Sequence, residues 1–199
     1  MITKTNLSVI TFDVETTHVA KPNGDTTPLP YFDNQLVSIG YKPLGASVVY
    51  DCYYHSTEEK THDAFPRFQA VLDECDVLIG HNIKFDLQWI RACGFTYEGD
   101  IYDTMVAEYI LSKGQSWPLS LAAVAEKYGG VQKENDLVQP YIDAGHTFYD
   151  IPWEIVKEYG ETDVIATQQV AVRQLEEFET TFEEIYGVKE PCAYAEAVA

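Results

Sequence analysis

One short stretch near the amino terminus, residues 9–17, constrains this chain more than any other part of it. It has the sequence VITFDVETT, in which apolar and β-branched residues predict a buried strand. Because successive side chains of a strand point to opposite faces, Asp13 and Glu15 should project side by side from one face. Two carboxylates this close repel each other, and a buried site keeps both ionised only where cations neutralise them. The pair therefore predicts a metal site; the alternative is a strand that frays into a solvated acidic turn.

Length and composition indicate one globular domain that spans residues 1–199. A chain of 199 residues can bury a real core, and its 46% hydrophobic and 13% aromatic residues exclude a disordered or fibrous protein. The four cysteines lack the spacing of metal or redox motifs, and the amino terminus does not resemble a signal peptide. No apolar run approaches the roughly 18 residues that a membrane span needs. We therefore expect a soluble, cytoplasmic protein with no membrane partner.

The order of the predicted elements indicates a mixed α/β fold. Three strands come first, at residues 9–17, 35–41 and 47–54, with a loop rich in turn formers at 18–33. Periodicity and end signals then predict a helix at 57–75, a strand at 76–80, a helix at 83–93, a strand at 101–102, helices at 104–113 and 119–128, and a long helix at 152–185. Residues 130–150 have no clear period and are predicted to form a surface segment. This order is typical of a mixed sheet flanked by helices.

A second polar group occurs at residues 82–86, with the sequence NIKFD. Residues four apart on a helix share a face, so Asn82 and Asp86 should point the same way. Asp86 could then reach the first pair of acids. The alternative is an ordinary surface aspartate on a helix whose N-cap is Asn82.

A third polar group occurs at residues 158–164, with the sequence EYGETDV. Tyr159 and Asp163 are four apart and share a helix face, which pairs a phenol with a carboxylate. Gly160 inside a helix costs about 1 kcal/mol relative to Ala, which indicates that a backbone or a ligand approaches closely there. The alternative is a solvated acidic helix with one amphipathic tyrosine.

The ordered set of Asp13, Glu15, Asp86, Tyr159 and Asp163 resembles the DEDD 3′–5′ exonucleases. It is most similar to the subgroup with Tyr in the third motif, and within it to the proofreading domain of family A (polymerase I-like) DNA polymerases. The resemblance covers about residues 7–180 and includes IGHNIKFDL at 79–87, YDTM at 102–105, LSL at 119–121 and AEKY at 125–128. The sister subgroup has a His where this chain has Glu158, so the chain resembles the Tyr branch.

The resemblance implies an RNase H-like fold and a two-metal site. The fold has a central five-stranded mixed sheet in the order 3-2-1-4-5, with strand 2 antiparallel and helices on both faces. The site holds two divalent ions, Mg²⁺ or Mn²⁺, which prefer carboxylate and water oxygens and can clamp a phosphoryl displacement from about 4 Å apart. The motif match implies that Asp13 bridges both ions and that Glu15 and Asp163 complete the first. Asp86 should hold the second, largely through water.

The same match gives a role to Tyr159 and candidate roles to four neighbours. Tyr159 should hydrogen-bond the attacking water, helped by Glu15; with a pKa near 10, the phenol orients the water rather than acting as a base. Four residues are substrate-binding candidates by their place beside the motifs: Thr16 and Val19 near the terminal nucleotide, and Asn82 and Lys84 near a phosphate. For each, the alternative is strand-end packing or a solvated side chain. His81 is predicted to be a hydrogen-bonded turn residue, because hard-metal sites rarely use imidazole.

The resemblance implies removal of nucleotides from the 3′ end of single-stranded DNA as 5′-monophosphates, in proofreading or DNA processing. RNase D-like enzymes of the same class degrade RNA, and nothing in this sequence separates ribose from deoxyribose readout, so an RNA exonuclease is an alternative. A module that binds nucleic acid or a polymerase without cutting is another, although all four carboxylates are present. Since no polymerase domain follows residue 199, we expect either a separately encoded DNA polymerase as partner or an origin as one domain of a longer chain.

The net charge argues against free nucleic acid as a tight ligand. There are 13 Lys and Arg against 32 Asp and Glu, a formal net charge of −19, which repels a polyanion. Two divalent ions would offset the four acids of the site locally. Five further acids are expected to face solvent near the end of the long helix: Glu176, Glu177, Glu179, Glu183 and Glu184. We therefore expect weak, salt-sensitive binding to DNA.

Overall fold

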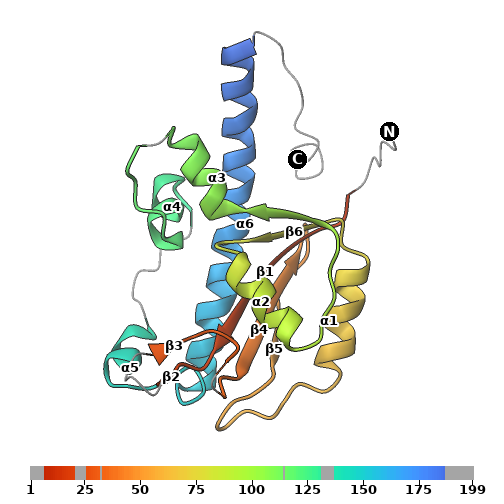
Figure 1. The fold of residues 1–199 in the computed structure, drawn as a ribbon, viewed down its shortest axis with the longest axis vertical. Coiled ribbons are helices and arrows are strands. Elements are labelled where there is room, and N and C mark those ends of the chain that lie inside the picture. Colours follow the sequence, from red (N-terminus) through yellow and green to blue (C-terminus); the bar gives the residue numbers. More distant parts are fainter. Residues whose placement is uncertain (1–6, 21–25, 32, 114, 131–136, 187–199) are drawn as a thin grey trace.

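A five-stranded mixed sheet forms the centre of the protein (Figure 1). The computed structural model describes residues 7–20, 26–31, 33–113, 115–130 and 137–186. The sheet contains β1 (Val9–Thr16), β4 (Leu36–Pro43), β5 (Val49–Cys52), β6 (Val77–Gly80) and β7 (Asp100–Asp103), in the order β5-β4-β1-β6-β7. β4 runs antiparallel to both β1 and β5, whereas β6 and β7 run parallel to β1 and to each other. The predicted order 3-2-1-4-5 with an antiparallel second strand is confirmed.

The apolar side chains of β1 face one side of the sheet. Ile10, Phe12 and Val14 alternate with the residues that face the other side, and they pack in one core cluster with buried residues of α1 (Ala64–Asp73) and α2 (Lys84–Ala92). Phe12 is 1% exposed. The period of two in β1 therefore separates an apolar face from the face that carries Asp13 and Glu15.

The long helix α6 (Trp153–Tyr186) covers the opposite face of the sheet (Figure 1). Its Ala171 packs with Val9, Val77 and Ile79 of the sheet, and its Gln168 donates a hydrogen bond to Thr11. Beyond the sheet, α6 packs against α3 (Thr104–Leu111) and α4 (Leu121–Lys127). Helices thus lie on both faces, as predicted for the RNase H-like fold.

Most predicted boundaries agree with the structure within two residues, but the helix predicted at 57–75 begins at Ala64. Pro66 lacks a backbone N–H and is tolerated in the first helical turn, so it marks the start of the helix rather than its interior. The preceding residues form a turn instead, in which the Nδ1 atom of His55 accepts hydrogen bonds from the backbone N–H groups of Thr57 and Glu58.

Two segments predicted without regular structure contain short elements. The loop predicted at 18–33 holds a two-stranded ribbon, β2 (Val19–Ala20) paired antiparallel with β3 (Thr26–Thr27). The segment predicted at 130–150 contains α5 (Gln139–Asp143), and its residues 131–136 lie outside the described part of the chain. Elements of two to five residues are too short to show a period. Among the described helices, none has the length and apolar character that crossing a membrane would require.

Candidate active site

Asp13 and Glu15 lie on the face of β1 that α6 covers. β1 pairs with β4 along its length but with β6 only over Val9–Thr11, so one edge of β1 is open beside the two acids. Asp13 is partly exposed, whereas Glu15 is 7% exposed. The prediction that these two side chains share a face is confirmed.

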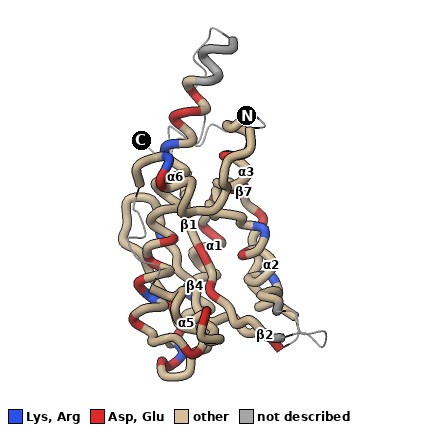
Figure 2. The backbone as a smooth tube through the Cα atoms, turned by 90° about the vertical axis from the view of Figure 1, so that its left-hand side faces the viewer, with Lys and Arg blue, Asp and Glu red and all other residues tan. Residues whose placement is uncertain are grey.

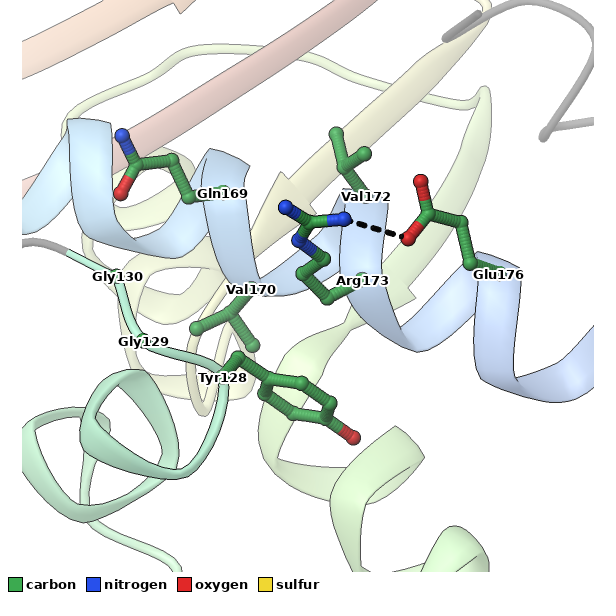
Figure 3. Close-up of a pocket in the computed structure, with 8 residues that line it drawn as sticks. All are labelled: Tyr128, Gly129, Gly130, Gln169, Val170, Val172, Arg173 and Glu176. Atoms are coloured by element: carbon green, nitrogen blue, oxygen red, sulfur yellow. Dashed lines mark hydrogen bonds and ion pairs between the residues drawn. The ribbon is translucent and has the colours of Figure 1, made fainter.

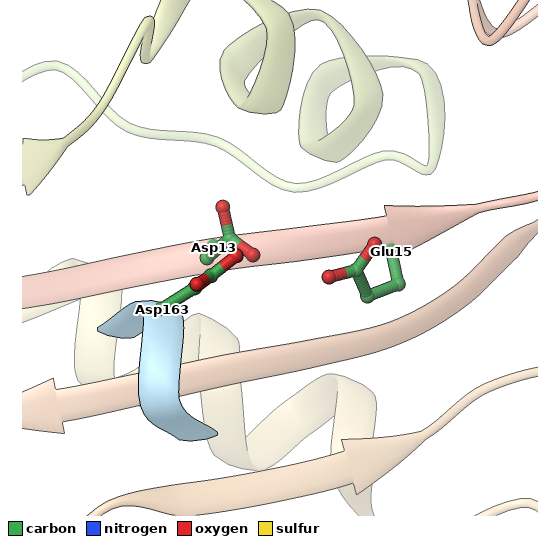
Figure 4. A group of neighbouring side chains, drawn as sticks. All are labelled: Asp13, Glu15 and Asp163. Carbon is green, nitrogen blue, oxygen red and sulfur yellow. The ribbon is translucent and has the colours of Figure 1, made fainter. Parts of the chain in front are cut away.

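α6 brings Asp163 to the same place (Figure 4). One carboxylate oxygen from each of Asp13, Glu15 and Asp163 lies within 4.8 Å of the other two, and Asp163 is 7% exposed. Three carboxylates this close repel one another in a poorly solvated setting. An all-oxygen acidic set is the kind that Mg²⁺ and Mn²⁺ prefer, so these residues fit a divalent cation.

Asp86 approaches β1 from α2, at the open edge of the strand. It is 2% exposed, and its Oδ1 atom accepts a hydrogen bond from the backbone N–H of Val14 at 3.1 Å. Burial, followed by the negative charge of Asp13, raises the pKa of Asp86 well above its ordinary value. Asp86 therefore lies beside the cluster of three acids without being part of that close group.

The alternative interpretation of Asp86 as a capped surface aspartate is wrong. Asp86 is buried, and Asn82 does not belong to the helix, because α2 begins at Lys84 and Asn82 has a φ of 56°. Asn tolerates this left-handed conformation better than most residues. The expectation that Asn82 and Asp86 share a helix face is therefore also wrong, since Asn82 precedes the helix.

Tyr159 lies one helical turn before Asp163 on α6. It is half-buried, and its ring packs against Phe148 with the ring centroids 5.6 Å apart. Glu158, which occupies the position of the His in the sister subgroup, is exposed. The solvated-helix alternative is wrong for Asp163, which is buried, and the spacing of Tyr159 and Asp163 sets both on the side of α6 that meets the rest of the fold.

Gly160 makes a close contact that the sequence predicted only in part. A Cβ atom at Gly160 would lie 2.3 Å from the hydroxyl of Tyr50, so no larger residue fits without movement. The close approach is as expected, but the approaching group is a side chain from β5 rather than a backbone or ligand. Sequence reasoning missed Tyr50, whose pKa is raised well above its ordinary value by burial and then by the charge of Glu15.

The four substrate-binding candidates lie in different settings. Thr16 is 2% exposed, which favours strand-end packing over contact with a nucleotide. Val19 is in β2, and its side chain lies outside the described part of the structure. Asn82 and Lys84 are exposed, and the backbone N–H of Asn82 donates to Asp103 at 3.0 Å. Both therefore remain accessible to a phosphate.

His81 is a hydrogen-bonded turn residue, as predicted. Its Nδ1 atom lies 2.9 Å from the Thr104 hydroxyl and its Nε2 atom 2.8 Å from the Leu119 carbonyl. Burial lowers the pKa of His81, which keeps the imidazole neutral. Asp103 caps the adjacent helix α3 by accepting hydrogen bonds from its first backbone N–H groups. These bonds fix the turn that leads into α2 and Asp86.

A hollow of about 430 Å³ lies between the end of α4 and α6 (Figure 3). It is lined by Tyr128, Gly129, Gly130, Gln169, Val170, Val172, Arg173 and Glu176. Its one basic side chain, Arg173, pairs with Glu176 at 2.9 Å. None of the predicted site residues lines this hollow, so it is separate from the candidate active site.

The acidic end of α6 faces solvent only in part. Acidic positions recur along α6 in Figure 2, where Lys and Arg are sparse. Glu176 is exposed, but Glu177 is 39% exposed and accepts a hydrogen bond from the Tyr128 hydroxyl at 2.6 Å. Glu179 is also half-buried, and the side chains of Glu183 and Glu184 lie outside the described part of the structure.

A protein-family model described as 3′–5′ exonuclease matches residues 2–177. The chain belongs to this exonuclease family. Members are hydrolytic nucleases that depend on divalent metal, and the cluster of Asp13, Glu15 and Asp163 supplies suitable ligands. The resemblance to the proofreading exonucleases of family A DNA polymerases is confirmed.

The exonuclease has relatives among much longer proteins. It is 32% identical to a DNA polymerase of Bacillus phage SP01 over 100 residues, which are 49% of this chain but only 11% of the polymerase. Its fold is similar to that of the family B DNA polymerase from Pyrobaculum calidifontis, with a TM-score of 0.60, 17% identity, and coverage of 97% of this chain and 27% of that one. It is also similar to the structure of Brucella melitensis NrnC with bound Mg²⁺, with a TM-score of 0.56 and 14% identity. The match covers 96% of this chain and 79% of the NrnC chain. These two structural likenesses concern the fold alone.

Proposed function

We propose that this exonuclease removes nucleotides one at a time from the 3′ end of single-stranded DNA. The observation that carries the proposal is the meeting of three carboxylates from β1 and α6 within 4.8 Å, in a chain of the exonuclease family. The choice of DNA is supported by the phage DNA polymerase among its relatives. Proofreading or DNA processing during replication is the corresponding biological role.

The acids of the site are proposed to hold two divalent ions, Mg²⁺ or Mn²⁺. Asp13 belongs to the close group with Glu15 and Asp163, and its negative charge, after burial, also raises the pKa of Asp86. We therefore assign Asp13 to both ions, Glu15 and Asp163 to the first, and Asp86 to the second. When bound, the ions supply the positive charge and Lewis acidity that an in-line phosphoryl displacement needs.

The remaining roles concern the attacking water and the scissile bond. Tyr159, one turn from Asp163, is proposed to hydrogen-bond the water together with Glu15, because a phenol hydroxyl can donate and accept hydrogen bonds. The water oxygen bonds to phosphorus, and the bond from phosphorus to the 3′ oxygen of the preceding nucleotide breaks. The products are a nucleoside 5′-monophosphate and a strand with a new 3′ hydroxyl.

The acidic surface suggests that another protein delivers the 3′ end. The net charge of −19 repels DNA everywhere except at the site, where bound metal ions would neutralise the acids. Binding to free DNA should therefore be weak and salt-sensitive. We propose a DNA polymerase, separately encoded or joined in a longer chain, as the partner. The cysteine spacing supports a cytoplasmic location.

The test is a time course on a single-stranded and a 3′-recessed DNA oligomer, each labelled at the 5′ end, with Mg²⁺, Mn²⁺ or EDTA. Wild type is compared with Asp163→Asn and with Glu154→Gln, an exposed acid on the same helix. We expect a metal-dependent ladder that shortens from the 3′ end in wild type and Glu154→Gln and is absent in Asp163→Asn. Equal cleavage by Asp163→Asn would refute the assignment of the site.

A matched RNA oligomer in the same assay decides the substrate. Faster cleavage of RNA than of DNA would replace the DNA assignment with the RNase D-like alternative. Cleavage of neither, by folded protein with and without a polymerase, would favour a module that binds without cutting.

A further inference from the structure

We propose that Tyr50 is a positioning residue that sets the spacing between the acids of β1 and the helix that carries Asp163. The inference rests on the proposed function of this site and adds a residue to it. Tyr50 lies on β5, two strands away from β1, and is not one of the three acids of the cluster. Tyr50 acts on the site by holding α6 at a fixed distance from the sheet that contains β1.

On the sheet side, Tyr50 is aligned with Asp13 across three strands. Gly40 of β4 pairs with Asp13 of β1 on one side and with Tyr50 of β5 on the other. Side chains at directly paired positions point to the same face, so Tyr50 projects from the face that carries the acids. Gly40 leaves the space between them open: a Cβ atom there would lie 2.8 Å from the Tyr50 ring. The ring thus lies over Gly40 of β4.

The hydroxyl of Tyr50 reaches the position next to Glu15. It lies 2.8 Å from the hydroxyl of Ser38, and Ser38 is the direct β4 partner of Glu15. The phenol therefore spans the part of β4 that lies opposite both acids of β1.

On the helix side, the same hydroxyl meets the backbone of α6. It donates a hydrogen bond to the carbonyl of Val156 at 3.2 Å, and it occupies the place where a Cβ atom of Gly160 would be. Trp153, in the first turn of α6, packs on the Tyr50 ring with centroids 5.7 Å apart. Tyr159 directly precedes Gly160 in the same helix, and Asp163 follows it.

These contacts make the phenol a spacer between two glycines. Gly40 lets the ring lie close to the sheet, and Gly160 lets the helix lie close to the hydroxyl. The distance between β1 and α6 determines whether Asp163 can share a cation with Asp13 and Glu15, and small displacements of metal ligands are costly. A residue without this hydroxyl leaves Val156 and Ser38 unbridged and allows α6 to shift.

The experiment compares wild type with Tyr50→Phe, Gly160→Ala and the matched control Tyr102→Phe. Tyr102 is also a sheet tyrosine, and its hydroxyl donates a hydrogen bond to Gln174 of α6 at 3.4 Å. Gln174 lies about three helical turns after Asp163 in α6. Mn²⁺ affinity is measured by electron paramagnetic resonance without substrate, and kcat and KM are measured on a single-stranded DNA oligomer. A thermal melt of each variant reports folding.

We expect Tyr50→Phe to weaken Mn²⁺ binding and lower kcat by about 10-fold, within the range seen for residues that orient metal ligands, while KM for the oligomer stays unchanged. Gly160→Ala should do the same, because its methyl group displaces Tyr50 or α6. Tyr102→Phe should lower stability without changing Mn²⁺ affinity.

Wild-type Mn²⁺ affinity and kcat in folded Tyr50→Phe would overturn the inference and leave the exonuclease proposal intact. An equal loss of Mn²⁺ affinity in Tyr102→Phe would also overturn it, since the effect would then be one of general stability. If wild type cleaves neither DNA nor RNA, the proposed function fails, and the Mn²⁺ measurements still decide the role of Tyr50.

Discussion

The Oδ1 atom of Asp86 accepts a hydrogen bond from the backbone N–H of Val14 at 3.1 Å. Val14 stands between the two acids of β1 in the sequence. The bond exists because β6 pairs with β1 only as far as Thr11, so the Val14 N–H faces an open strand edge. Asp86 replaces the missing ladder partner at that edge. The Asp86 side chain therefore has two effects. It stabilises β1 through the hydrogen bond to Val14, and it can add a negative charge near that of Asp13.

Asp86→Asn and Asp86→Ala should separate these two effects. The amide oxygen of Asn can still accept from Val14 and adds no charge, so we expect stability to be kept or increased while cleavage falls at least about 100-fold through loss of a metal ligand. Ala leaves the Val14 N–H without this partner and should cost about 1–3 kcal/mol of unfolding free energy. Urea unfolding and the oligomer assay measure the two quantities. Equal destabilisation by Asn and Ala would show that the hydrogen bond is unimportant.

The raised pKa of Asp86 predicts how the metal-free protein responds to pH. The folded state holds the proton more tightly than the unfolded state, so Asp86 contributes its full stability below its ordinary pKa, and that contribution is lost as pH rises through the folded pKa. In EDTA, the melting temperature should therefore fall as pH increases from about 4 toward neutrality. Asp86→Asn should remove this part of the slope. An identical slope in wild type and Asp86→Asn would contradict the prediction.

Local patterns predicted the parts of the site that a single element determines. The period of two on β1 placed Asp13 and Glu15 together, and the four-residue spacing on α6 placed Tyr159 and Asp163. The strand order followed from the resemblance to a family rather than from periodicity. Residues whose positions depend on one element or on a recognised motif could therefore be predicted from the sequence.

Contacts between different elements could not be predicted from the sequence. Asn82 was assigned to a helix because helical spacing cannot detect a left-handed residue at φ 56° just before the first turn. Gly160 signalled a close approach, but Tyr50 lies 110 positions earlier in the numbering, and no spacing rule connects the two. The start of α1 was missed because polar residues before Ala64 are compatible with either a helix or a turn.

Glu108 is predicted to be the main polar link between α3, α4 and α6. It is 1% exposed and accepts hydrogen bonds from Lys127 at 2.8 Å and Gln174 at 3.0 Å. The Tyr128 hydroxyl lies 3.0 Å from Glu108 and shares its one proton between Glu108 and Glu177. Burial raises its pKa, but the bonds from Lys127, Gln174 and Tyr128 outweigh burial and lower the pKa below 4.5. The stability that Glu108 provides is therefore present above that ordinary value and is lost as pH falls through the folded pKa.

Replacing Glu108 by Ala should lower the free energy of unfolding by about 1–3 kcal/mol at neutral pH, because Gln174 loses a buried partner. Glu176→Gln is the control, since Glu176 forms only a surface pair with Arg173 in which both side chains are 59% exposed. That pair should contribute less than about 1 kcal/mol. Urea unfolding of both variants at neutral and acidic pH makes the comparison. Similar losses in the two variants would mean that burial of the Glu108 bonds adds nothing.

Divalent metal should raise the melting temperature of this protein, because it binds the folded acidic cluster and not the unfolded chain. At a metal concentration about 100 times Kd, mass action predicts about 2.7 kcal/mol of added stability. Asp163→Asn should melt higher than wild type in EDTA, since one of three carboxylates within 4.8 Å loses its charge, but it should gain much less from Mn²⁺. Glu154→Gln should gain as much as wild type. If Asp163→Asn gains equally, the ion binds elsewhere on the acidic surface, and the cluster of Asp13, Glu15 and Asp163 is not the metal site.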